Sequence, residues 1–335
     1  MRQRLEYIDA LKGFAILLVV MGHVIPWSFE SLDAVTSMSP TPILLWKIIY
    51  SFHMPLFMFI SGFLFGQSHF TSVKEYFVKM WKKMKMLIIP WLVCGILVQM
   101  WRGGRELTYW YLLTLFQLLL LVGIENFFFD KIKNKTHQII VEVITLGTTL
   151  LILNFATHFY NGSALYVCYD WYPHLRGMFG YFALGSFIMR HIDMTTLMNS
   201  KMYSVCLLFF CISCVVDIPY TSFMSISLKS ITAIYCCLYL FKVCFTEGYA
   251  INYFKRIGKK TLQIYILHLF FGIKIIQMGQ YLITLVNGDK MEFITAFVLQ
   301  LLFSLALSMV IIELCLIAGK IIKTSKLFSF MILGE

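Results

Sequence analysis

The chain has 335 residues, of which 59% are hydrophobic and 13% charged, with a formal net charge of +11. A soluble domain carries about 25% charged residues, so this composition excludes a soluble protein. It predicts an all-α, polytopic bundle of membrane helices in which residues 1–335 form a single domain.

The first apolar segment, residues 9–29, contains three residues that are costly in lipid: Asp9, Lys12 and His23. Asp9 and Lys12 fall near its start, where a lysine side chain is able to reach the lipid headgroups. His23 follows Lys12 by eleven residues, about 16 Å along a helix, near the middle of a membrane core roughly 30 Å thick. Eleven residues make about three turns, so both side chains point to one side. We therefore expect one face of this helix to meet protein or water.

Further apolar runs, each close to the ~20 residues that a spanning helix needs, follow along the chain. They cover residues 43–66, 86–104, 107–126, 138–157, 173–190, 202–218, 222–245, 261–284 and 293–319. About ten transmembrane helices are therefore predicted, and an even number places both ends of the chain on one side.

The lysine and arginine residues predict which side that is, because cytoplasmic connections are enriched in them. One set of connections carries nineteen of these residues and the opposite set only four. Both termini are therefore expected to be cytoplasmic, in a multi-pass protein of the cell inner (plasma) membrane. Residues 67–85 and 246–260 are expected inside and residues 158–172 outside. The same asymmetry explains most of the positive charge, so no nucleic-acid partner is expected.

Several short motifs occur in a fixed order along the chain. The first is DALKGFAILLVVMGH at 9–23, an acidic residue and a Leu-Lys-Gly stretch followed by an apolar run that ends in His. The others are SFHMPLFMFISGFLFG at 51–66, YWYLLTLF at 109–116, GYFALGSFI at 180–188 and IGKKTLQIYILHLF at 257–270. Together they make the chain resemble the acyltransferase 3 family of integral membrane acyltransferases, with Lys12 where that family usually has Arg.

The resemblance implies transfer of an acyl group, most often acetyl, from cytoplasmic acyl-CoA to a hydroxyl of a glycan or glycolipid. Acetyl-CoA is then the donor substrate, and His23 and Asp9 are the predicted catalytic residues. An imidazole at mid-membrane depth suits a general base, and it is equally able to carry the acyl group itself as an acyl-imidazole. The sequence leaves both roles open. It contains no zinc, P-loop or dinucleotide motif, so no metal and no redox cofactor are expected.

The family often has an Arg-x-x-Arg pair in the cytoplasmic loop after the second span, where this chain has VKMWKKMKMLIIPW at 78–91. Two lysine pairs fit that spacing, although an ammonium does not grip a phosphate bidentately as a guanidinium does. The predicted donor-binding residues are Lys12, Lys82, Lys83, Lys85 and His268. An ordinary positive-inside loop is the alternative for the lysines after the second span. His268, about 10 Å into the ninth span, either lines a CoA tunnel or bonds a neighbouring helix.

Three polar residues near the outer ends of spans are predicted to bind the acceptor: His53, His174 and Arg176. The alternative for each is an ordinary interfacial residue. A different reading of the whole chain is a transporter or exporter of a glycan or lipid, which also needs many spans and buried polar residues. We find no internal inverted repeat of the kind that many transporters have. A non-catalytic scaffold would leave Lys12 and His23 unexplained. The expected partners are acyl-CoA, a glycan or glycolipid acceptor, and membrane lipid.

Overall fold

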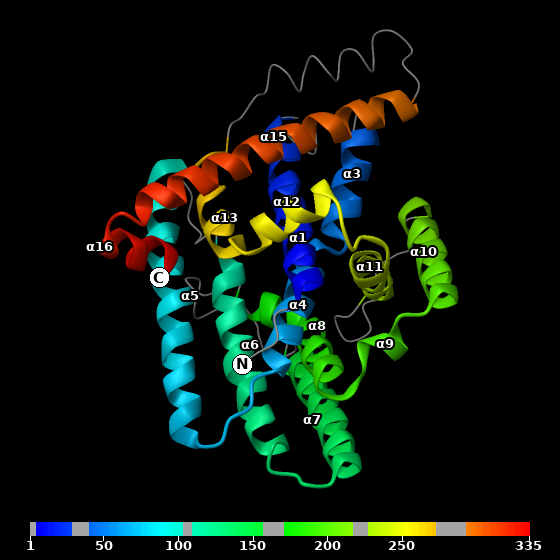
Figure 1. Ribbon diagram of the computed structural model, residues 1–335, viewed down its shortest axis with the longest axis vertical. Coiled ribbons are helices and arrows are strands. Elements are labelled where there is room, and N and C mark those ends of the chain that lie inside the picture. Colours follow the sequence, from blue (N-terminus) through cyan, green and yellow to red (C-terminus); the bar gives the residue numbers. More distant parts are fainter. Residues whose placement is uncertain (1–4, 29–39, 103–108, 157–170, 217–226, 273–292) are drawn as a thin grey trace.

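The computed structural model describes residues 5–28, 40–102, 109–156, 171–216, 227–272 and 293–335. Every regular element within these ranges is a helix, which confirms the all-α prediction (Figure 1). The described part of the chain contains six helical stretches long and apolar enough to cross a membrane. These are α1 (Glu6–Ser28), α3 with α4 (Pro40–Tyr50 and His53–Gly66), α5 (Val73–Arg102), α6 (Trp110–Phe129), α7 (Lys135–Phe155) and α15 (Phe293–Ile322).

Helices also lie in the other predicted spans, of which 173–190 is described in full. Four helical segments lie there: α8 (Trp171–His191), α10 (Ser200–Val215), α11 (Leu228–Tyr239) with the π-helix η4 (Leu240–Cys244), and α13 (Thr261–Leu267). Residues 217–226 and 273–292 lie outside the described ranges, and they include parts of the predicted spans 202–218, 222–245 and 261–284. The total of about ten spans and the cytoplasmic position of both termini therefore stay predictions.

The start of α5 differs from the sequence expectation of a connection over residues 67–85. The helix already begins at Val73, thirteen residues before the predicted third span. The Ser72 hydroxyl accepts a hydrogen bond from the Glu75 N–H (3.2 Å), and the Glu75 carboxylate accepts one from the Thr71 N–H (2.9 Å). Such reciprocal capping stabilises the first turn of a helix. The lysines of this segment consequently stand on a continuous helix rather than in a loop.

Helix α1 lies at the centre of the molecule and packs against α12 (Tyr249–Gly258), α4 and α15 (Figure 1). Its approach to α12 is close enough to require glycine. A Cβ atom at Gly13 would collide with the backbone carbonyl of Phe254, and one at Gly258 with that of Asp9. Small residues allow membrane helices to approach so closely. This packing brings the segment that follows α12 against α1, which positions the site.

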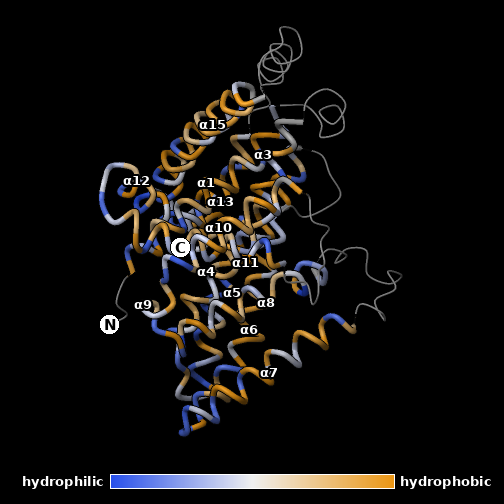
Figure 2. The backbone as a smooth tube through the Cα atoms, turned by 90° about the vertical axis from the view of Figure 1, so that its right-hand side faces the viewer, coloured by the Kyte–Doolittle hydropathy of each residue, from blue (hydrophilic) through white to orange (hydrophobic). Residues whose placement is uncertain are grey.

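The remaining elements are short. They are α9 (Met194–Leu197), α16 (Lys326–Phe328) and the π-helix η5 (Ser329–Leu333). The last of these packs on α5. Helix α15 crosses α1 and α13 (Figure 1) and has hydrophobic residues along most of its length, as Figure 2 shows.

Candidate functional site

Three of the histidines predicted from the sequence lie near one another. His23 projects from α1, and His268 directly follows α13, with 5.2 Å between the two ring centroids. His53, the first residue of α4, is close enough to His23 for an electrostatic interaction between the two imidazoles. Trp27, one turn further along α1, stacks on the His23 ring at a centroid distance of 5.6 Å. Three separate helical segments therefore converge on His23.

Backbone carbonyl groups hold two of these imidazoles in fixed orientations. Nδ1 of His53 lies 2.8 Å from the carbonyl oxygen of Ile49, and Nδ1 of His268 lies 2.7 Å from that of Tyr265. A carbonyl oxygen only accepts hydrogen bonds, so Nδ1 of each ring carries a proton and Nε2 is the acceptor nitrogen of the neutral ring. Both histidines are buried. Their positions relative to His23 are consequently set by the protein and not by solvent.

A narrow pocket of about 230 Å³ follows α1 toward this histidine cluster. It is lined by Lys12 and by Val19, which are about 10 Å apart along the helix. Val19 is one turn before His23. Tyr265 also lines the pocket, and its ring centroid lies 5.8 Å from that of His268. The pocket therefore leads from a lysine at one end of α1 to the neighbourhood of His23.

The wall of the narrow pocket is mostly apolar, with a pair of hydroxyl groups in it. The hydroxyl oxygens of Ser61 and Tyr111 lie 3.0 Å apart. The Tyr265 ring packs on Tyr111 at 5.2 Å and on Tyr109 at 5.8 Å between centroids. The Tyr109 hydroxyl donates to the carbonyl oxygen of Ile266 (2.6 Å). These aromatic contacts fix the segment that carries His268.

A wider pocket of about 820 Å³ adjoins the narrow one. The two cavities share the residues Ser61, Leu64, Lys83, Met86, Leu87 and Leu115. Lys79, Lys82 and Lys83 of α5 line the wider pocket, together with Asp9 of α1. Because the cavities share a wall, a ligand with an anionic head and a slender apolar arm would fit across both.

Lys85 and Asp9 lie apart from the histidines. The ammonium group of Lys85 is 5.4 Å from the centre of the Trp81 ring, and the described lining of the two cavities does not include Lys85. The Asp9 carboxylate is 3.4 Å from the Lys12 ammonium, and it is about 21 Å from His23 along α1. The structure thus groups Asp9 with the lysines, whereas Lys85 faces a different side of α5.

The predicted acceptor residues on α8 connect to the pocket through aromatic rings. The His174 ring stacks on Trp110 with 4.0 Å between centroids. Trp110 in turn contacts Tyr111, a residue of the narrow pocket, at 6.4 Å. Arg176 is half-buried on the same helix and interacts electrostatically with Tyr172. His174 is therefore two rings away from the pocket, on the side of α6.

Sequence reasoning missed several residues of this site. Trp27, Ser61, Tyr111 and Tyr265 all contact or line it, although none was predicted. Three of them fall inside motifs that carried the family resemblance: Ser61 in 51–66, Tyr111 in 109–116 and Tyr265 in 257–270. Their position within those motifs was the feature of the sequence that could have identified them as site residues. Among the residues that the structure describes, no group of three His, Cys, Asp or Glu side chains is placed to hold a metal ion.

The family of the chain is shown by comparison with models of known protein families. A family model described as an acyltransferase domain matches residues 5–313, which is nearly the whole chain. No curated protein and no solved structure matches.

Proposed function

Since this chain belongs to the acyltransferase 3 family, we propose that it transfers an acetyl group from acetyl-CoA to a hydroxyl of a cell-surface polysaccharide or of its lipid-linked precursor. The membrane acyltransferase class follows from the family match and the apolar helices. The donor, the acetyl group and the acceptor are our proposal. The observation that carries it is the narrow pocket, which leads along α1 from Lys12 toward the contact between His23 and His268.

The two adjoining cavities suit the two parts of acyl-CoA. Lys82 and Lys83 supply positive charge in the wider pocket, where the phosphates of the nucleotide would bind. Lys79 lies beside them in an ion pair with Glu75 at 2.6 Å. The narrow pocket has an apolar wall with the hydroxyl groups of Ser61 and Tyr111, and it would take the slender pantetheine arm. In this arrangement the thioester arrives next to His23, and Lys12 stands beside the arm near its phosphate end.

His23 is the proposed reacting group. As a general base, it removes the proton of the acceptor hydroxyl while the oxygen attacks the thioester carbonyl; the C–S bond breaks, and the CoA thiolate takes up that proton. As an acyl carrier, its unprotonated nitrogen attacks the thioester carbonyl, and CoA leaves as the thiol with the proton of the ring N–H. The acceptor oxygen then displaces the imidazole from the acetyl carbon, and the hydroxyl proton returns to the ring. Intact-protein mass recorded under native conditions without acceptor separates the two routes, because only the second adds an acetyl group to the protein.

The other predicted residues receive supporting roles. Asp9 would hold Lys12 in place through their ion pair. His268 would orient His23, since its own ring is anchored on the Tyr265 carbonyl. His53 would contact the acceptor hydroxyl near His23, and His174 with Arg176 would bind the acceptor further out. These assignments follow the contacts of the residues with Lys12 and His23 and the place of His174 and Arg176 on α8.

Release of free thiol from acetyl-CoA by the purified protein tests the proposal. We expect His23→Gln to lower turnover by about 10²- to 10⁴-fold, as for loss of a general base. His137→Gln is the matched control, because His137 is exposed on α7 and should leave turnover unchanged. Wild-type turnover by a folded His23→Gln protein would refute the catalytic assignment. Glycan export without any use of acetyl-CoA would favour the transporter instead. Comparing the masses of surface glycans with and without the protein would identify the acceptor.

A further inference from the structure

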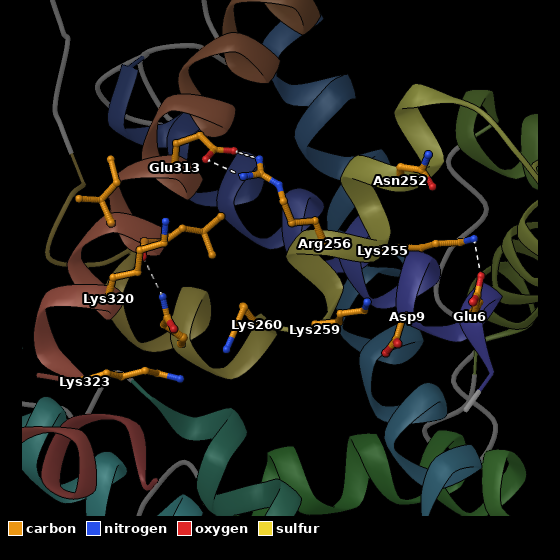
Figure 3. Close-up of a pocket in the computed structure, with 13 residues that line it drawn as sticks. Glu6, Asp9, Asn252, Lys255, Arg256, Lys259, Lys260, Glu313, Lys320 and Lys323 are labelled. Carbon is orange, nitrogen blue, oxygen red and sulfur yellow. Dashed lines mark hydrogen bonds and ion pairs between the residues drawn. The ribbon is translucent and has the colours of Figure 1, made fainter. Parts of the chain in front are cut away.

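A second basic cavity, of about 640 Å³, lies beside α12 and the end of α15 (Figure 3). Asp9 is the only residue in its described lining that also lines the wider pocket, so the lysines of α5 are not part of it. Its cations come from two separate segments: Lys255, Arg256, Lys259 and Lys260 from α12 and the turn after it, and Lys320 and Lys323 from α15 and its end. Two distant segments thus direct their basic side chains toward one space.

The carboxylates in this cavity neutralise only part of that charge. Arg256 forms a bidentate ion pair with Glu313, and Lys255 forms an ion pair with Glu6 at 2.7 Å. The third carboxylate of the lining, Asp9, pairs with Lys12 outside the cavity. Within the described part of the chain, the remaining cations Lys259, Lys260 and Lys320 have no ion-pair partner. The cavity therefore holds excess positive charge.

Two of the cations lie close to each other. The ammonium group of Lys323 lies beside that of Lys260 and lowers its pKa, because two positive charges repel each other. Lys323 also forms an ion pair with the carboxylate of Glu335. Glu335 is held in reach because Gly334 lies against the backbone of Met86 on α5. An acidic side chain of the protein itself thus already neutralises one edge of the lysine cluster.

We propose that this cavity is a binding site for a phosphate group, held by Lys260, Lys320 and Lys323. A phosphate has several acceptor oxygens and suits a cluster of ammonium donors from different directions. The anion would relieve the repulsion between Lys260 and Lys323 and would compete with the Glu335 carboxylate for Lys323. A soluble nucleotide and the headgroup of an anionic lipid both present such a phosphate. The proposal does not depend on acyl transfer, because it concerns binding alone.

An ordinary positive-inside connection would also be rich in lysine. Two observations distinguish this cavity from one. The cations come from segments far apart in the sequence and line one cavity, and the ends of the Lys260 and Lys323 side chains point toward each other (Figure 3). The repulsion that lowers the pKa of Lys260 is also unfavourable in the absence of an anion. Lysines that only set the orientation of the chain in the membrane would require neither feature.

The test uses the full chain in an uncharged detergent, with Lys79→Gln/Lys82→Gln/Lys83→Gln as the background, so that the α5 lysines of the wider pocket do not contribute. Calorimetric titration with adenosine 3′,5′-bisphosphate probes the nucleotide source. Native mass spectrometry with phosphatidylglycerol, against phosphatidylcholine, probes the lipid source. We expect one of the two probes to bind, and the added changes Lys260→Gln/Lys320→Gln to weaken it at least about tenfold, because charge-assisted bonds to phosphate are lost.

Control variants separate the site from general charge effects. Lys133→Gln/Lys135→Gln removes the same charge from exposed positions and should leave binding unchanged. Lys260→Arg/Lys320→Arg keeps the charge and should keep binding, which excludes misfolding as the cause of a loss. Glu335→Gln should strengthen binding severalfold, since it removes a competing carboxylate. The proposal is overturned if neither probe binds, or if the Lys260→Gln/Lys320→Gln change has no more effect than the control pair.

Discussion

The most apolar stretches of helices α1 and α7 have nearly the same mean hydropathy, 1.9 and 1.7. Of these stretches, 83% is buried within the protein in α1 but only 11% in α7. Both are predicted as spans from the sequence in the same way. Hydropathy measures whether a helix is compatible with the membrane, and lipid is as apolar as a protein core. It therefore does not distinguish a central helix from a peripheral one. The distinction lies in the small and polar residues of each helix.

The two helices are also held in different ways. At Gly13 of α1, a Cβ atom would collide with the backbone of α12, whereas one at Gly147 of α7 would have nothing within 4 Å. Helix α7 is attached by charge: the buried Glu142 carboxylate accepts from Arg190 at 3.2 Å and lies 2.7 Å from the ring of His191. Close backbone packing fixes α1, whereas a buried ionic cluster and a hydrogen bond from Thr149 to Glu125 (2.8 Å) hold α7. Each mode of attachment can be broken separately.

The largest expected effect is at Gly13. We expect Gly13→Val to prevent assembly of the protein, because the side chain would collide with the backbone carbonyl of Phe254, which cannot move aside as a flexible side chain would. Gly147→Val on α7 is the matched control and should be tolerated. Yield and size-exclusion profile in detergent measure the difference. A monodisperse Gly13→Val protein with normal turnover would show that α1 and α12 are not in such close contact.

The next effect concerns the attachment of α7. The Arg190 guanidinium lies 2.9 Å from Asp130 and 3.2 Å from Glu142. Arg190→Met leaves both carboxylates without this partner. Removing one partner of a buried ion pair costs about 3–5 kcal/mol. We expect the free energy of unfolding to fall by that order, measured by thermal or denaturant melting. Lys135→Met, an exposed position on α7, should change it little. Equal stability of both variants would mean that packing alone holds α7.

A smaller effect is expected at Lys12. Here a lysine of α1 that lines the narrow pocket is compared with Lys135, an exposed lysine of α7. Lys12→Ala should raise the KM for acetyl-CoA about tenfold, close to the low end of the range for a lost hydrogen bond to a charged group. Lys12→Arg should retain most activity, because arginine also supplies a positive charge. Lys135→Ala on α7 should leave KM unchanged. Steady-state kinetics on folded protein measure all three, and an unchanged KM for Lys12→Ala would remove this residue from the donor site.

The smallest effect is expected on α5, where lysines that line the wider pocket are compared with Lys85, which is not in its described lining. Lys82→Gln/Lys83→Gln should raise the KM for acetyl-CoA a few fold, and Lys85→Gln should raise it less, because Lys85 lies over the Trp81 ring. The effect should weaken in high salt, since exposed charges are screened beyond about 8 Å at physiological ionic strength. Lys133→Gln serves as the control for general charge loss. Equal effects of all these variants would mean that the lysines act only through total charge.

The sequence alone predicted the membrane class, the all-helical fold, the family and the positions of most spans. It also placed Lys12 and His23 on one face of the first helix. The membrane class, the helices and this shared face follow from composition and from the repeat of a single helix, in which 1.5 Å and 100° per residue relate any two positions. The family followed instead from the resemblance of the ordered motifs. The early start of α5 was missed because its first turns are rich in lysine, and their low hydropathy is typical of a loop. Ser72 and Glu75 nevertheless cap this segment as a helix.

Only the tertiary structure placed His268 beside His23, put Tyr265 and Tyr111 along one narrow pocket, and separated Lys83 from Lys85. It also gathered Lys260 and Lys323, which are 63 positions apart, in one cavity. Contacts of this kind depend on how separate helices pack, and packing is set by small residues and side-chain shape at each interface rather than by any periodicity along the chain. The sequence specifies those contacts, but their pattern becomes visible only when the helices are assembled.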